Sequence, residues 1–245
     1  MFYLTSNHRK HKKKDTTQYK IIMYDPTIRT VVEVVSAIMC FILLRFMIKP
    51  YKLTGEGRYL GLPLGFGFLG VSYILGAIAF SDIISSFRQL SYLQLFARTF
   101  AYCFLVVTYY FSRKRSENSR IKWDITLSLL IVGLAASIVT GIIIPQFAVD
   151  SYQATQVYVR SFNIICLIYI SIHTLRSHIE KPDPMTIWIP FGFILLGISQ
   201  YSLLIWAIDR SIFAFNGALA LRLTGLAIFL LVTYITFNKS SKKVV

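Results

Sequence analysis

Charged residues are scarce in this chain of 245 residues: only 15% are Asp, Glu, Lys or Arg, and just 11 are acidic. A soluble protein of this length needs a polar shell, which so few charges could hardly provide. Hydrophobic residues reach 55%, and the mean hydropathy is +0.59. The scarcity of charge argues against a soluble globule and favours an all-α integral membrane protein.

Motifs of common enzymes and metalloproteins are also absent. The sequence has no HExxH or CxxC zinc pattern, no Walker A motif and no GxSxG elbow. Its three cysteines, Cys40, Cys103 and Cys166, lie singly in apolar segments without metal-ligand or disulfide spacing. We therefore expect no enzyme activity, no metal and no cofactor.

Basic residues are abundant, with 26 Lys and Arg and a net charge of +15. A nucleic-acid-binding domain would gather such residues on one folded polar surface. Here they occupy short segments between apolar runs, which is typical of membrane topology. We expect the lipid bilayer, and not nucleic acid, as the partner of this chain.

Long apolar stretches define the predicted architecture. A bilayer crossing requires about 20 apolar residues in a helix. Seven stretches reach that length, and they lie near residues 28–48, 60–81, 89–111, 123–144, 154–175, 186–207 and 213–237. The sequence therefore predicts a single seven-transmembrane-helix domain, in a membrane that we expect to be the cell membrane.

The orientation follows from the basic residues of the loops, because cytoplasmic loops are enriched in Lys and Arg. One side of the membrane receives Lys49, Lys52, Arg58, Arg113, Lys114, Arg115, Arg120, Lys122, Arg176, Lys181, Lys239, Lys242 and Lys243. The other side receives only Arg29, Arg88 and Arg210. This asymmetry predicts a cytoplasmic C-terminus, and seven crossings then put the N-terminus outside.

Residues 1–22 form a basic tail that conflicts with this orientation, since six of them are Lys or Arg and only Asp15 is acidic. Such a polar segment is expected to be disordered. Either the tail crosses the membrane despite its charge, or translation begins at Met23 and the domain spans residues 23–245. We favour the second interpretation.

An internal repeat organises the chain. Residues 63–72, PLGFGFLGVS, recur as residues 190–199, PFGFILLGIS, at an offset of 127. We expect residues 28–111 and 154–237 to be two copies of a three-helix unit, joined by a connector helix at 123–144. An odd connector gives both copies the same orientation, so the sequence predicts a parallel 3+1+3 repeat.

The glycines of this repeat have two interpretations. Gly65, Gly67 and Gly70 match the dinucleotide pattern GxGxxG, but that chemistry needs the glycines at a strand–turn–helix junction and not inside an apolar helix. Gly61 and Gly65 instead form a GxxxG spacing that lets helix backbones approach closely. A Pro/Gly segment present in both copies is also typical of a transport site between repeats.

The overall plan resembles that of the PQ-loop sugar transporters and of microbial rhodopsins. Residues 213–237 hold no Lys for a retinal Schiff base, and Pro145-Gln146 lies at the end of the connector instead of in a repeated helix. The resemblance is therefore one of plan, and neither family is assigned.

Charged residues within the spans are the strongest functional signal, because each is unfavourable in hydrocarbon and tends to face a partner or water. At 1.5 Å per residue, Glu33 and Arg160 lie roughly 8–9 Å below the outer surface, and two further arginines lie roughly 14 Å below it. The candidate ligand-binding residues are Glu33, Arg98, Arg160, Asn163, Gln200 and Arg222, with Ser72 and Ser199 as further hydrogen-bonding groups.

Two arrangements of these residues are open. A Glu33–Arg160 ion pair could hold the two repeats together, or the surplus of arginine could accept a small anionic solute in an outward-facing cavity. The second favours a transporter. The alternatives are a seven-helix sensor acting through a separate cytoplasmic partner, and a structural subunit or homo-oligomer in a membrane complex.

Overall fold

The computed structural model describes residues 26–54, 60–80, 88–112, 118–143, 152–180 and 187–241, with Pro182 and Pro184. The α-helices are α2 (Pro26–Thr54), α3 (Gly61–Phe80), α4 (Arg88–Ser112), α5 (Asn118–Ile143), α7 (Tyr152–Glu180), α8 (Trp188–Asp209) and α9 (Ile212–Ser241). These seven helices are long and apolar enough to cross a membrane, as expected for a multi-pass membrane protein. The basic tail and Met23 lie outside the described residues.

The ends of the helices are set by proline and by polar residues. Pro63 and Pro190 are both the third residue of their helices, α3 and α8. The first four N–H groups of a helix have no intrahelical acceptor, so proline at this position loses no hydrogen bond. α2 and α7 extend beyond the predicted spans, since α2 continues through Pro50 and α7 reaches Glu180. The helices are thus longer than their apolar stretches, and their polar ends can lie at the membrane surface.

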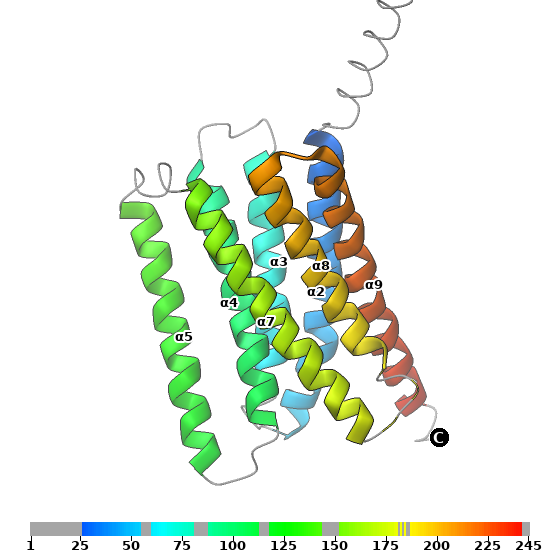
Figure 1. The fold of residues 1–245 in the computed structure, drawn as a ribbon. Helices are drawn as coiled ribbons and strands as arrows, with labels where there is room; N and C mark the ends of the chain where they lie inside the picture. Colours follow the sequence, from blue (N-terminus) through cyan, green and yellow to red (C-terminus); the bar gives the residue numbers. More distant parts are fainter. Residues whose placement is uncertain are drawn as a thin grey trace, which may run out of the picture.

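Six of the helices enclose a common interior (Figure 1). α3 packs between α2 and α4, and α8 packs between α7 and α9. The two groups meet where α4 packs on α7 and where α2 packs on α9. α5, green at the edge of Figure 1, packs mainly on α4, and its Trp123 also lies against Gly61 of α3. Any site built from several helices must therefore lie between the two groups.

Glycine allows the close packing that the sequence predicts. A Cβ at Gly65 would lie 2.6 Å from Cδ2 of Leu105 and 3.3 Å from the carbonyl oxygen of Ala101, both on α4. A Cβ at Gly61 would overlap the side chain of Thr108 on the same helix. Contacts this short require glycine, so the predicted role of the GxxxG spacing in helix packing is confirmed.

Two hydrophobic clusters fill the interior at different depths. The larger cluster includes Phe66, Phe193 and Phe229, whose rings lie 5.6 Å (Phe66–Phe229) and 4.7 Å (Phe193–Phe229) apart. The smaller cluster consists of Leu203, Trp206, Phe215, Ala218 and Leu219. Along α9, Arg222 comes between Leu219 of the smaller cluster and Leu226 of the larger one. A charged layer therefore separates two apolar layers.

Candidate functional site

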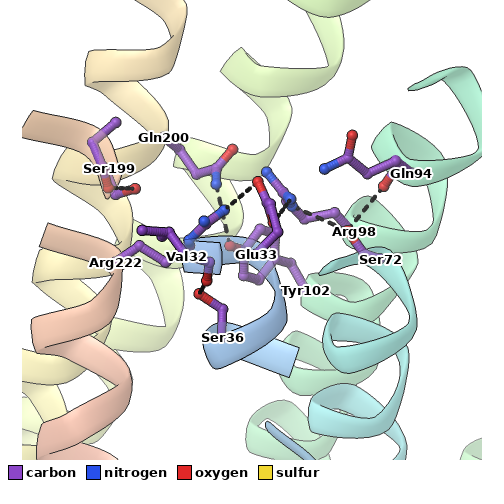
Figure 2. A network of polar contacts seen from close by, with 11 residues as sticks. Val32, Glu33, Ser36, Ser72, Gln94, Arg98, Tyr102, Ser199, Gln200 and Arg222 are labelled. Atoms are coloured by element: carbon purple, nitrogen blue, oxygen red, sulfur yellow. Dashed lines mark hydrogen bonds and ion pairs between the residues drawn. The ribbon is translucent and has the colours of Figure 1, made fainter. Parts of the chain in front are cut away.

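Three charged side chains from three helices meet inside the bundle (Figure 2). Glu33 of α2 accepts a hydrogen bond from Arg222 of α9, with 3.0 Å between Oε1 and Nη1. Nη2 of Arg98, on α4, lies 4.0 Å from the second carboxylate oxygen. Each of the three residues is at most 4% exposed. One of the two arrangements left open by the sequence paired Glu33 with Arg160, whereas the structure joins Glu33 to Arg222 and Arg98.

Tyr73 of α3 contributes its aromatic ring to this cluster. The guanidinium carbons of Arg98 and Arg222 lie 4.9 and 4.5 Å from the ring centroid. Cation–π contacts of this kind stabilise by about 0.5–2 kcal/mol, towards the upper end where water is excluded. Because Tyr73 is fully buried, its ring helps to keep both guanidiniums close to Glu33.

Ser72 fixes the position of Arg98. Nε of Arg98 donates a hydrogen bond to Oγ of Ser72 at 3.2 Å, and that hydroxyl donates to the carbonyl oxygen of Gln94 at 3.1 Å. The hydroxyl thus acts as acceptor and donor at once, which satisfies it within the buried site. α3 and α4 are linked at the level of the cluster by this chain of hydrogen bonds (Figure 2).

Gly76 provides room beside the carboxylate. A Cβ at this position would lie 3.2 Å from the carboxyl carbon of Glu33 and 3.0 Å from the carboxamide carbon of Gln94. These two side chains come from α2 and α4, and both are buried. The absence of a side chain on α3 therefore lets Glu33 and Gln94 approach the same point.

The cluster lies beside a small cavity. The cavity is lined by Arg29, Glu33, Ser91, Gln94, Leu95, Arg98, Arg160, Leu203, Phe215, Leu219 and Arg222. Its free space is about 20 Å³, which is room for about one water molecule. Four of the predicted residues, Glu33, Arg98, Arg160 and Arg222, thus surround one space, but a larger ligand could enter only if the helices or side chains moved.

Arg29 lies at the apolar margin of the cavity. Its guanidinium carbon is 4.7 Å from the ring centroid of Phe215 and 5.7 Å from that of Trp206. Both rings belong to the smaller hydrophobic cluster. Arg29 therefore links the start of α2 to α8 and α9, and so covers the charged layer from the side where α2 begins.

Several polar atoms of the cluster have no hydrogen-bond partner among the described residues. They include Nε and Nη2 of Arg222 and Nη2 of Arg98. A buried donor without a partner is unfavourable by about 1–3 kcal/mol, and more when it is charged. Because Arg222 is only 1% exposed, these donors favour an additional acceptor inside the protein.

Asn163 and Gln200, the two amides predicted for the site, are buried but do not line the cavity. Nε2 of Gln200 donates to the hydroxyl of Tyr102 at 3.4 Å. The amide atoms of Asn163 have no hydrogen-bond partner within the described part of the chain. Ser199 donates to the carbonyl oxygen of Ala218 at 2.7 Å and so links α8 to α9.

Sequence reasoning missed Tyr73, Gly76, Gln94 and Arg29 as parts of the site. Arg29 was counted as a loop residue, because it lies near the predicted end of a span. Tyr73 is next to Ser72 and one helical turn before Gly76, so the small residues of α3 were the available signal. Within the described residues, no group of three His, Cys, Asp or Glu side chains could hold a metal ion.

The chain was compared with protein-family models, with curated proteins and with solved structures. No family model, curated protein or solved structure matches it. Its function is therefore argued from the site itself.

Proposed function

We propose that the protein binds a small anionic solute at the Glu33–Arg98–Arg222 cluster and carries it across the membrane. The observation that supports this proposal is an imbalance of charge: two arginines share one carboxylate where each residue is at most 4% exposed. An uncompensated buried charge is unfavourable by several kcal/mol. A bound anion would neutralise it and would accept hydrogen bonds from the arginine donors.

We also infer that α2–α4 and α7–α9 are two copies of one three-helix unit, with α5 as the connector. Equivalent hydrogen bonds support this inference. Ser72 donates to the carbonyl oxygen of Gln94 at 3.1 Å, and Ser199 donates to that of Ala218 at 2.7 Å. The serines are 127 residues apart, which is the offset of the sequence repeat, and the acceptors are 124 residues apart.

The glycine contacts support the same inference. A Cβ at Gly65 would meet Leu105, and a Cβ at Gly192 would meet Phe229 at 2.7 Å. These pairs again differ by 127 and 124 residues. Arg98 and Arg222 are also 124 apart, so both units supply an equivalent arginine to the cluster.

The cluster is on the side that we propose to be outside. α2, α4, α7 and α9 begin on this side, and the cavity is lined by residues near the starts of α4 and α9. The basic loops follow the other ends of the helices, which favours a cytoplasmic C-terminus. The solute would accordingly enter from outside, past the smaller hydrophobic cluster.

Movement of the solute requires the two apolar layers to open in turn. The smaller cluster covers the site on the outer side, and the larger cluster with Phe66, Phe193 and Phe229 covers it on the inner side. Rocking α2–α4 against α7–α9 would open one layer at a time. The small size of the cavity is what a closed stage between these two states requires.

The test is uptake of radiolabelled acetate, chloride and phosphate by proteoliposomes, together with binding in detergent. We expect at least one of these anions to be taken up by the native protein, and Arg98→Gln and Arg222→Gln to lose that uptake. Arg176→Gln is the matched control, because Arg176 is exposed and forms an exposed ion pair with Glu180 at the end of α7.

The outcomes separate the alternatives. Binding of an anion without uptake would favour the sensor. Unchanged uptake by both cluster variants, each verified as folded by circular dichroism, would show that the anion does not pass through this site. Absence of any anion binding would favour a structural subunit, in which the cluster only joins the helices.

A further inference from the structure

One edge of the guanidinium of Arg222 indicates which class of anion the cluster binds. We infer that Arg222 binds a planar, monovalent oxyanion, such as a carboxylate, through the edge formed by Nε and Nη2. This inference rests on the proposed function, because it concerns the anion site of the same cluster. It adds the shape and the charge of the solute.

The geometry of Arg222 indicates the shape of the anion that it can bind. Its Nη1 donates to Glu33 at 3.0 Å, so the carboxylate of the protein occupies that nitrogen. Nε and Nη2 lie together on the other edge, and neither has a hydrogen-bond partner among the described residues. The two N–H groups of this edge point in parallel directions and match the two oxygens of a carboxylate. A spherical anion could not accept both in the same way.

The surroundings favour this edge as a binding group. Arg222 is 1% exposed and lines the cavity, and its guanidinium is held by Glu33 and by the ring of Tyr73. A donor edge held in this way is preorganised, so that little conformational entropy is lost when an anion binds. Leu203, Phe215 and Leu219 line the same cavity and would contact an apolar substituent of the solute.

The net charge of the cluster favours a monovalent anion. Arg98, Arg222 and an ionised Glu33 sum to +1, which one monovalent anion neutralises. A divalent anion would leave an excess negative charge in a site with little access to water. Arg29 and Arg160 also line the cavity, and each has further interactions outside the cluster of Glu33, Arg98 and Arg222.

The free space limits the head group. About 20 Å³ admits one water molecule, so the entering group must be flat and small, and apolar side chains at the cavity must shift to admit it. Carboxylate and nitrate are planar and monovalent, whereas sulfate and phosphate are tetrahedral and bulkier. Shape and charge therefore indicate the same class.

The experiment measures the thermal midpoint and the Kd of the purified full chain in nanodiscs. The probes are the sodium salts of acetate, nitrate, chloride and sulfate at equal ionic strength. We expect acetate and nitrate to bind about tenfold or more tightly than chloride and sulfate, because chloride offers no pair of oxygens to the edge and sulfate is divalent and bulkier. This comparison needs no variant, so a failure of any variant to fold leaves it intact.

Two variants test the roles of shape and charge separately. Arg222→Lys keeps the positive charge but loses the parallel donors, and should reduce the preference for acetate over chloride about tenfold. Arg176→Lys is the matched control, because Arg176 is exposed at the end of α7 and lies outside the cluster, and it should keep the preference. Glu33→Gln raises the charge of the cluster to +2 and should shift the preference towards sulfate.

The inference is wrong if chloride or sulfate binds as tightly as acetate to the native protein, or if a folded Arg222→Lys keeps the full preference. In either case an anion still binds, and the proposed function stands. If none of the four salts binds, the proposed function fails as well. These results distinguish the two proposals.

Discussion

Glu33→Gln and Arg222→Gln, alone and combined, test whether the cluster holds the helices together. The two side chains are 3.0 Å apart, and their exposures are 4% and 1%. Removing Glu33 leaves buried, uncompensated charge, which is unfavourable by about 3–5 kcal/mol, whereas removing Arg222 deletes a charge-assisted hydrogen bond and leaves the carboxylate with Arg98. Both single variants should therefore destabilise the protein strongly.

The position of Arg98 decides the order of the effects. Because Arg98 lies 4.0 Å from the carboxylate, it can replace Arg222, so Arg222→Gln should lose about 3 kcal/mol. Glu33→Gln leaves two guanidiniums without their shared carboxylate and should lose about 5 kcal/mol. The combined variant leaves only one arginine unpaired and should lose about 3–5 kcal/mol, which corresponds to a coupling energy of about 3–5 kcal/mol.

The assay is unfolding of the purified protein in mixed dodecylmaltoside–SDS micelles, followed by circular dichroism. The matched control is the pair of Arg176 and Glu180, whose side chains are also close, at 3.2 Å, but are 69% and 50% exposed. The same cycle on that pair should give a coupling energy of about 0.3–0.5 kcal/mol. Equal coupling energies for the two pairs would refute the reasoning, because burial would then have no effect.

Two further predictions concern helix packing. Gly192→Ala should lower the free energy of unfolding by about 1–2 kcal/mol, because its Cβ would lie 2.7 Å from the buried ring of Phe229. Gly217→Ala should raise the free energy of unfolding by about 0.5–1 kcal/mol, because no atom lies within 4 Å of the added Cβ and Ala favours a helix over Gly. If Gly217→Ala were less stable than Gly192→Ala in the same unfolding assay, both predictions would be wrong. Cys103 of α4 and Cys166 of α7 lie close to each other where these two helices pack, so oxidation with copper-phenanthroline should remove two of the three free thiols. Thiol titration measures the loss, and three remaining free thiols would contradict the proximity of Cys103 and Cys166. If α2–α4 rock against α7–α9 during transport, the disulfide between these cysteines should also stop uptake.

The helices could be predicted from the sequence because each is a long apolar run. The same reasoning identified Glu33, Arg98 and Arg222 as charged residues within the spans but not the directions in which they point. At about 100° per residue, an error of one position rotates a side chain by a quarter turn or more. The choice of Arg222 over Arg160 as the partner of Glu33 depends on the packing of α2 against α9, which apolar sequences do not encode in an obvious pattern.

The polar layer was harder to predict than the helices because its members are ordinary residues. Tyr73 and Gly76 have no distinctive motif, and their roles come from being on the face of α3 that meets α2 and α4. The repeated serines were recognised because they recur, and each links neighbouring helices by a hydrogen bond to a backbone carbonyl. Repetition is thus more informative about packing than about which side chain binds a ligand.

The sequence distance between Glu33 and Arg222 has a consequence for biosynthesis. The hydrogen bond between them spans 189 residues, so Glu33 enters the bilayer long before its partner is translated. During synthesis the carboxylate can first meet Arg98, and the cluster is completed only when α9 inserts. Only Arg210 and Ser211 join α8 to α9, so these two helices enter as a hairpin. A chain that stops before α9 has Glu33 and Arg98 but lacks Arg222, so its charged layer is incomplete.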